Sequence, residues 1–275
     1  MTTAYHSDEL PAGQTALRTV AAGLAGGALA LAAWFVLHRI SLPAFNTSMV
    51  TRSLATAASF VLIGIGAVLA VLWARGTRPW ISAAVMALVP AGLVVSSIGI
   101  PLAATKLYLD GIQVDQGFRT QFLSRMTENL GHADMAYKDL PTFYPMGWFW
   151  LGGRLANVLG MQGWEVYQPF AIASLAAGAA MLTPVWRRLT GSLPTALAIA
   201  TVTTAVVLTE VPEEPYAAVV AMFVPAAAIM AYRAVNGSWA STIALAVYLG
   251  ISASFYTLFT AIAALTTVVI AVVLA

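Results

Sequence analysis

The chain has 275 residues, of which 60% are hydrophobic and 9% are charged, and its mean hydropathy is +0.84. A soluble domain is about half apolar and about a quarter charged, so this composition excludes a soluble globular protein and indicates an integral membrane protein. The formal net charge of +2 is too small to suggest a nucleic-acid partner, and the absence of cysteine excludes disulfides and thiolate chemistry.

Eight apolar segments predict an all-α, polytopic helical bundle. A membrane-spanning helix needs about 17–25 mostly apolar residues. The predicted spans cover residues 17–37, 54–73, 80–105, 168–186, 194–208, 216–232, 239–255 and 258–275. Kinks are predicted at Pro90, Pro101, Pro169, Pro184 and Pro225. The polar first 14 residues lack the basic segment of a cleavable signal peptide, so the first span is expected to be retained.

These spans divide the chain into three spans within residues 16–105, a polar loop at residues 106–165, and the remaining spans within residues 166–275. Much of the ionisable chemistry lies in the polar loop, which is where a membrane protein is expected to act on a polar substrate. The final apolar run ends without a basic or aromatic terminator. We therefore expect residues 1–275 to be the N-terminal transmembrane region of a longer protein.

Basic residues divide almost evenly between the two sides of the membrane. The positive-inside rule therefore gives an orientation only if the polar loop is set apart as a folded unit. The short loops then place the N-terminus inside and the polar loop outside. The arginines expected on the cytoplasmic side are Arg18, Arg75, Arg78, Arg187, Arg188 and Arg233.

Residues 143–159 are apolar enough to span a membrane, but the segment is short, begins with aromatic residues and contains Arg154 and Asn157. We predict an interfacial helix that lies along the outer surface. If it lies flat, the polar loop and the acidic turn at residues 210–214 fall on the same side. If it spans, they fall on opposite sides.

Residues 115–131 predict an amphipathic helix, because apolar residues recur on one face at 100° per residue. This face holds Phe118, Phe122, Leu123, Met126 and Leu130. Arg119 falls within it, and Asp115, four residues earlier, projects to the same side. Two interpretations remain open: an ion pair that neutralises itself, or a carboxylate base beside a cation that receives a phosphate.

Other polar residues have simpler interpretations. Asp110 is the rival candidate for the carboxylate base, but it precedes Gly111 and is predicted to be a turn residue. The spacing of His132 and Asp134 is not specific for a metal. Tyr144 and Trp148 belong to an aromatic cluster that suits a membrane interface and could also stack on a sugar. The acidic turn either is solvated or holds a divalent cation through its three carboxylates, Glu210, Glu213 and Glu214.

No phosphate-binding glycine loop, zinc-protease motif or nucleophile elbow occurs in the sequence, so nothing indicates a nucleotide-driven pump. Gly23, Gly26 and Gly27 in the first span are predicted to be helix-packing residues.

Three strings resemble the galactan 5-O-arabinofuranosyltransferase family of the GT-C superfamily: VDQGFRTQFLSRMTENLGHADMAY, FYPMGWFWLGGRLANVLG and EPYAA. The resemblance implies a GT-C-like bundle in the plasma membrane, with its active site outside. It implies transfer of arabinofuranose from decaprenyl-phosphoryl arabinose to galactan in arabinogalactan synthesis. It also implies a C-terminal half, with further spans and a soluble domain, that this chain lacks. Met146 departs from the pattern, in which a second proline is expected.

In that family type an acid in an outer loop acts as the base, and Asp115 occupies the matching position. A polyprenyl phosphate leaves readily, so the reaction needs a base and positive charge more than a strong acid, and one displacement inverts the anomeric centre. The residues expected to bind substrate are Arg119, Arg125 and Arg154 for the phosphate, with Tyr144, Trp148, Glu213 and Glu214. No cofactor is assigned beyond a candidate divalent cation. Alternatives are another GT-C polyprenyl-phosphate-sugar transferase, a non-catalytic assembly subunit, and a transporter.

Overall fold

A computed structural model describes residues 8–77 and 79–274 of the chain, so the expectations for residues 1–7, Arg78 and Ala275 lie outside the described residues. Within that part the secondary structure is helical, and the nearest approach to a strand is one bridge between Ala133 and Pro141. The helices are α1 (Ala12–Leu37), η1 (Phe45–Thr47), α2 (Met49–Ala74), α3 (Pro79–Val94), η2 (Val95–Gly99), α4 (Val114–Glu128), α5 (Gly147–Leu159), α6 (Gly163–Thr190), α7 (Leu193–Glu210), α8 (Pro215–Ala221), α9 (Val224–Val235), α10 (Trp239–Phe255) and α11 (Thr257–Leu274).

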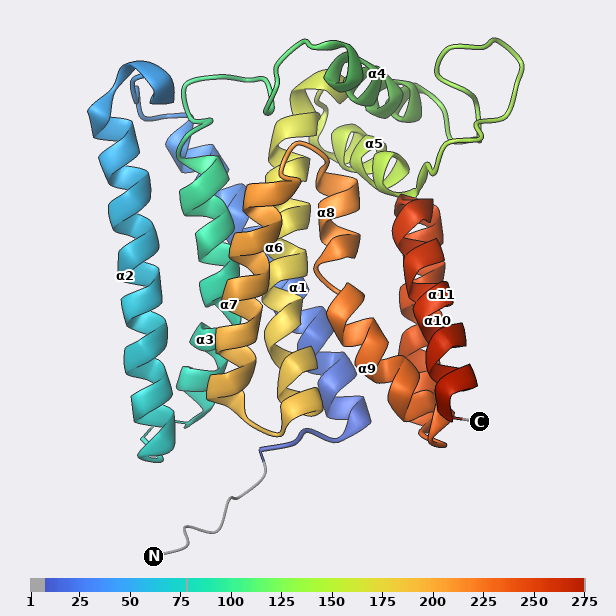
Figure 1. The fold of residues 1–275 in the computed structure, drawn as a ribbon. Coiled ribbons are helices and arrows are strands. Elements are labelled where there is room, and N and C mark those ends of the chain that lie inside the picture. The colour runs from blue at the N-terminus through green and yellow to red at the C-terminus, as the bar shows by residue number, and fades with distance from the viewer. Residues whose placement is uncertain (1–7, 78, 275) are drawn as a thin grey trace, which may run out of the picture.

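The prediction of an all-α, polytopic bundle is confirmed. Seven helical segments of the described chain are long and apolar enough to cross a membrane, α3 with η2 and α8 with α9 each counting as one. The shorter α10, of 17 residues, connects the lower end of α9 to the upper end of α11 in Figure 1. Successive spans therefore alternate in direction, as the eight predicted segments require.

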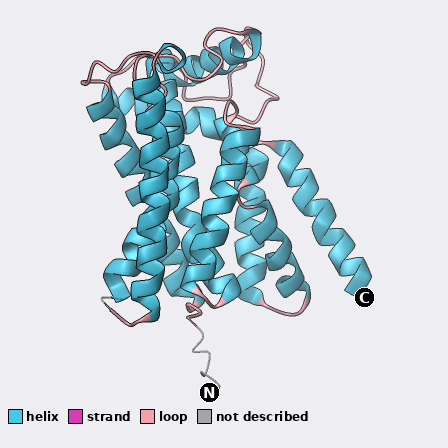
Figure 2. Ribbon diagram, turned by 60° about the vertical axis from the view of Figure 1, so that its left-hand side comes forward, coloured by secondary structure: helices cyan, strands magenta, loops and turns pink. Residues whose placement is uncertain are grey.

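Helix α6 forms the centre of the bundle. Within its apolar span 78% of the residues are buried, against 6% in α11, which leans away from the other helices in Figure 2. Helix α1 packs closely against α6 at Gly26, where an added Cβ would lie 2.8 Å from the Ala176 carbonyl oxygen. This contact confirms that Gly26 is a helix-packing residue.

Two predicted spans are interrupted. The third changes from α-helix to the π-helical η2 and ends at Gly99, six residues before the predicted boundary at residue 105. The sixth breaks between α8 and α9. Proline has no N–H to donate and its ring clashes with the carbonyl four residues earlier. For Pro225 that residue is Ala221, where α8 ends. Pro90, Pro169 and Pro184 lie inside continuous helices.

The polar loop leaves η2 and returns to α6 at the same end of the bundle, and α4 and α5 lie across that end (Figure 1). The beginning of the loop is anchored by Gln168 of α6, whose Nε2 donates to the carbonyls of Thr105 at 2.9 Å and Leu107 at 2.7 Å. Trp34 of α1 donates to the Oε1 of Gln168 at 2.8 Å, so one buried amide ties the loop to two spans.

Helix α5 does not cross the bundle, as predicted, but it differs from the expected surface helix. It begins at Gly147 rather than at residue 143, and it packs between α4 and the bundle with Trp148 and Phe149 fully buried. The polar loop and the acidic turn consequently lie on the same side of the protein, which is the arrangement expected for a segment that does not span.

Candidate functional site

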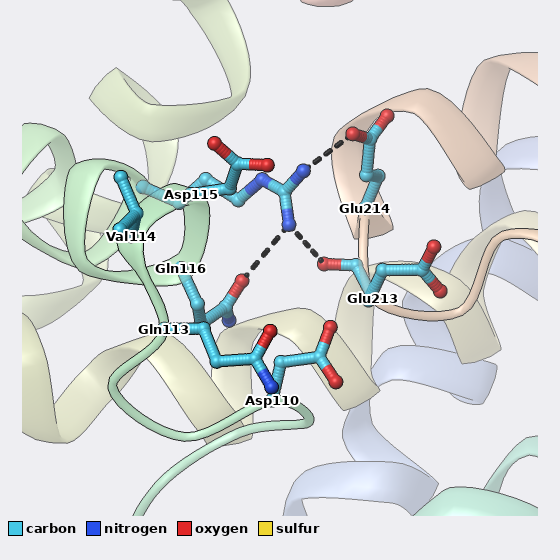
Figure 3. Close-up of a pocket in the computed structure, with 8 residues that line it drawn as sticks. Asp110, Gln113, Val114, Asp115, Gln116, Glu213 and Glu214 are labelled. Atoms are coloured by element: carbon cyan, nitrogen blue, oxygen red, sulfur yellow. Dashed lines mark hydrogen bonds and ion pairs between the residues drawn. The ribbon is translucent and has the colours of Figure 1, made fainter.

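A pocket of about 490 Å³ lies where the N-terminal end of α4 meets the acidic turn between α7 and α8. It has a volume in the range of ligand-binding sites. Its lining residues, drawn in Figure 3, are Asp110, Gln113, Val114, Asp115, Gln116, Arg119, Glu213 and Glu214. The first six come from the polar loop and the last two from the acidic turn, so the pocket exists only because the fold joins these segments.

Helix α4 presents both an exposed carboxylate and a buried guanidinium to this pocket. Asp115 lies in the first turn, where a carboxylate interacts favourably with the helix dipole, and its side chain is exposed. Gln116 and Arg119, one turn apart, lie on the buried face together with Leu123 and Met126. The prediction that Arg119 faces the protein is confirmed, whereas the buried position beside it belongs to Gln116 and not to Asp115.

The guanidinium of Arg119 forms four hydrogen bonds. Nη2 donates to Oε1 of Glu214 in an ion pair, and Nη1 donates to Oε1 of Gln116 at 3.2 Å and to the Glu213 carbonyl at 3.4 Å. Figure 3 shows these three contacts as dashed lines. Nε donates to the Tyr216 hydroxyl at 3.3 Å. Burial alone would lower the pKa of Arg119, but its interactions with Tyr216 and then Glu214 raise it, so the side chain stays charged.

Three tyrosines, Tyr108, Tyr144 and Tyr216, hold Arg119 and the acidic turn in place through hydrogen bonds. The Tyr144 hydroxyl donates to that of Tyr216 at 2.9 Å, and the Tyr108 hydroxyl donates to the Pro212 carbonyl at 2.7 Å, which holds the acidic turn against the polar loop. Burial is the main cause that raises the pKa of Tyr108 and of Tyr144. Both phenols therefore remain neutral hydrogen-bond donors at physiological pH.

The pocket is acidic, because four carboxylates surround one arginine: Asp110, Asp115, Glu213 and Glu214. The carboxylate of Asp115 lines the pocket and forms no ion pair or hydrogen bond with another described residue. Negative charge disfavours a phosphate here and favours hydroxyl groups or a group on which positive charge develops.

The expected pair between Asp115 and Arg119 is not formed, since Glu214 takes the guanidinium instead. The expected base, Asp115, lines the pocket together with three of the seven expected substrate-binding residues, Arg119, Glu213 and Glu214. The other four do not line it, namely Arg125, Tyr144, Trp148 and Arg154. Tyr144 donates a hydrogen bond to Tyr216, which also accepts a hydrogen bond from Arg119. Arg125 lies in the last turn of α4, where a cation interacts favourably with the helix dipole.

Trp148 and Arg154 are structural in this fold, which corrects the expected substrate contacts. Trp148 is fully buried, and its Nε1 donates to the Ser174 hydroxyl at 3.0 Å, so no sugar can stack on the ring. Nη2 of Arg154 donates to the carbonyls of Met126 and, at 3.3 Å, of Asn129. These are carbonyls at the C-terminal end of α4 that lack partners within the helix, so Arg154 caps α4.

The acidic turn does not fit a divalent cation. Glu214 is paired with Arg119, and the Glu213 side chain extends away from Glu214 in Figure 3. Within residues 8–77 and 79–274, no three histidine, aspartate or glutamate side chains are arranged to hold a metal ion. Helix α7 also ends at Glu210, and this residue does not line the pocket.

Asp110 has a φ of 64° and Gly111 a φ of 61°, so the predicted turn is confirmed. Asp110, the rival candidate that was assigned to the turn, also lines the pocket. The sequence did not indicate that Gln116 and Tyr216 bind Arg119. The spacing of Gln116 three residues before Arg119 was the available signal for the first of these partners. For Tyr216 the only signal in the sequence was its position shortly after Glu213 and Glu214.

The family profile described as "Arabinofuranosyltransferase N terminal" matches residues 18–275. The chain belongs to this family. A relative from Corynebacterium glutamicum, named galactan 5-O-arabinofuranosyltransferase, is 48% identical over 289 aligned positions that cover 98% of the chain. Relatives of the same name from Mycolicibacterium smegmatis and Mycobacterium tuberculosis are 38% and 36% identical and cover 93% and 90% of the chain.

The expected family is thereby confirmed. This member of the arabinofuranosyltransferase N-terminal family spans 44%, 42% and 39% of the length of these three relatives, which is less than half of each.

Proposed function

We propose that this chain supplies the base and part of the substrate pocket of a membrane glycosyltransferase. The enzyme would transfer arabinofuranose from decaprenyl-phosphoryl arabinose to galactan during arabinogalactan synthesis. The names of the relatives support the sugar and the acceptor. The observation that carries the proposal is the unpartnered carboxylate of Asp115, which lines an acidic pocket at one end of a membrane bundle.

Asp115 acts as the general base. As the acceptor hydroxyl attacks the anomeric carbon, a new C–O bond forms, the bond to the phosphate oxygen breaks, and the hydroxyl proton passes to the carboxylate. The polyprenyl phosphate departs with the bonding electron pair. Because this is one displacement, the configuration of the anomeric carbon inverts.

The acidic pocket suits the sugar more than the phosphate. Positive charge develops on the ring oxygen and anomeric carbon when a glycosyl bond breaks, and nearby carboxylates stabilise that charge. Arg119 lines the pocket but has four of its five N–H donors engaged, so we assign it to holding Glu214 and the acidic turn in place. This replaces the expectation that Arg119 receives the phosphate.

The pocket would face the outside of the plasma membrane. Arg75, Arg187, Arg188 and Arg233 lie at or near helix ends on the side opposite to the pocket. When the polar loop is set apart as a folded unit, the positive-inside rule makes this side the cytoplasmic face. The chain contains no cysteine, so single-cysteine variants test this directly. An impermeant thiol reagent added to whole cells should label Lys138→Cys and should spare Asn236→Cys. The opposite pattern would contradict the proposed orientation.

The experiment that tests the function compares Asp115→Asn with Asp110→Asn in the full-length protein. Loss of a general base costs about 10²–10⁴-fold in rate, so Asp115→Asn should abolish measurable transfer while lipid donor still binds. Asparagine tolerates a positive φ, so Asp110→Asn should keep both the turn and the transfer. Normal turnover by Asp115→Asn would remove this residue from the role, and loss only in Asp110→Asn would make Asp110 the base.

A further inference from the structure

A second cavity, of about 360 Å³, lies between α2 and the π-helical end of the third span. It is lined by Phe45, Arg52, Ala55, Thr56, Ser59, Ser96, Ser97 and Pro101. None of these residues lines the acidic pocket. The two cavities differ in charge, because this one contains an arginine and four hydroxyl groups and no carboxylate.

The hydroxyl groups of the cavity are of two kinds. Ser59 of α2 and Ser96 of η2 hydrogen-bond to each other at 2.8 Å and join the two helices. Thr56 and Ser97 are exposed, and their hydroxyls form no hydrogen bond within the described part of the chain. Most threonines and serines in apolar helices satisfy the hydroxyl on a carbonyl of the preceding turn. Two that line a cavity without doing so are available to a ligand.

Arg52 is held in place beside these hydroxyls. Nε donates to the Phe45 carbonyl at 3.0 Å and Nη2 to the Asn46 carbonyl at 3.2 Å. Both contacts are to backbone oxygens, and no carboxylate of the described residues forms an ion pair with the guanidinium. Nη1 has no partner among the described residues, and it can donate to an anion without breaking either contact.

The π-helical geometry of η2 brings the two serines to the cavity. A π-helix accommodates an extra residue in a turn, and such segments occur frequently at functional sites. Here the segment Val95–Gly99 carries Ser96 and Ser97 on consecutive positions, and both line the cavity.

The order of residues along α2 matches the order of groups in a membrane lipid. Arg52 lies in the first turn of α2, at the same end of the bundle as the acidic pocket. Thr56 lies about 6 Å further along the helix and Ser59 about 10 Å, at about 1.5 Å per residue. Beyond them α2 exposes the apolar side chains of Phe60 and Ile63. A cation at the membrane edge is therefore followed by hydroxyls and then by an apolar surface.

We propose that this cavity binds the phosphate head of a membrane lipid. Arg52 pairs with the phosphate, Thr56 and Ser97 donate hydrogen bonds to its oxygens or to the adjoining ester, and the acyl or polyprenyl chain lies along α2. An anionic phospholipid and a polyprenyl phosphate share this chemistry. The cavity shares no lining residue with the acidic pocket, so lipid binding here can be measured without assuming the proposed transferase reaction.

The test measures lipid binding to the full-length protein in detergent, with decaprenyl phosphate, phosphatidylglycerol and inorganic phosphate as separate probes. Arg52→Gln should weaken binding of at least one lipid by about tenfold, the effect of one charge-assisted contact. Arg39→Gln is the control, because Arg39 lies outside the cavity, in the connection between α1 and α2, with its Cζ 4.1 Å from the centroid of the Phe35 ring.

Arg52 also supports the backbone of η1, so Arg52→Gln could lose lipid binding through misfolding. A second pair of variants, which leaves Arg52 in place, separates these two causes. Thr56→Leu should occlude the cavity and weaken lipid binding, whereas Ala57→Leu, on the exposed neighbouring position of α2, should not. Preference for decaprenyl phosphate would identify a donor-type lipid, and preference for phosphatidylglycerol or equal binding would identify a membrane phospholipid. Wild-type lipid binding in both Arg52→Gln and Thr56→Leu, or binding of inorganic phosphate alone, would overturn the proposal.

Discussion

Arg119 and Glu214 lie 95 residues apart in the sequence and form an ion pair that joins α4 to the turn between α7 and α8. The Arg119 side chain is only 9% exposed and that of Glu214 is 25% exposed, so the pair is shielded from water on one side. Both residues line the acidic pocket, and their contact sets the position of α4, which carries Asp115, relative to the acidic turn.

Removal of Arg119 should therefore destabilise the protein. Arg119→Met leaves Glu214 partly buried without a partner, and partial exposure reduces the cost of such a loss to about 1–3 kcal/mol. The apparent Tm in detergent should fall by several degrees, and the double variant with Glu214→Gln should lose less than the sum of the single effects. Lys106→Met, from the exposed pair with Glu165, is the control and should change stability by less than about 1 kcal/mol. An equal loss of stability in Arg119→Met and in the control Lys106→Met would contradict the role of Arg119.

Gly153 of α5 should not tolerate a side chain. An added Cβ would lie 2.6 Å from the Met126 carbonyl carbon and 2.7 Å from its oxygen, and these are backbone atoms that can move only if α4 and α5 separate. Gly153→Ala should lower the apparent Tm and expose the polar loop to protease. Gly117→Ala is the matched control, because nothing lies within 4 Å of its Cβ, and it should be neutral or stabilising by up to about 1 kcal/mol. Protease resistance of Gly153→Ala equal to wild type would show that the helices are not packed this closely.

Trp148 should matter for stability and not for substrate affinity. Trp148→Phe removes the hydrogen bond to Ser174 and leaves a cavity, at a cost of about 1–3 kcal/mol. We expect a lower apparent Tm with an unchanged KM for the lipid donor. Phe143→Ala, at an 88% exposed position in the same aromatic segment, should leave the Tm unchanged. A raised KM with an unaltered Tm in Trp148→Phe would restore the stacking role.

Tyr108 should make the protein sensitive to alkaline pH. Burial raises its pKa well above the ordinary value of 10.0, so above pH 10 the unfolded state loses a proton that the folded state keeps. The stability that this group contributes is fully present below pH 10 and is lost at about 1.4 kcal/mol per pH unit as the pH rises toward the folded pKa. Tyr108→Phe should be less stable at pH 8 but lose stability less steeply between pH 10 and pH 11. Parallel curves of apparent Tm against pH would contradict this assignment.

Local composition was sufficient to predict the spans and the character of α4. A run of apolar residues long enough to cross a bilayer has few alternatives to a helix, so the predicted segments at residues 54–73 and 239–255 became α2 and α10. The 100° periodicity likewise placed Arg119 on the buried face of α4. Pro225 indicated an irregularity near the break between α8 and α9, but the prediction was a single kinked span across this position.

The amino-acid sequence by itself thus determined which segments are apolar enough to span and which face of α4 is buried, because both depend on residues within a few helical turns. Only the tertiary structure decided that Glu214, and not the nearby Asp115, pairs with Arg119, and that Trp148 is enclosed rather than presented to substrate. Those outcomes depend on how α4, α5 and the acidic turn pack at one end of the bundle. Such packing brings together side chains far apart in the sequence, and no local periodicity encodes their distance.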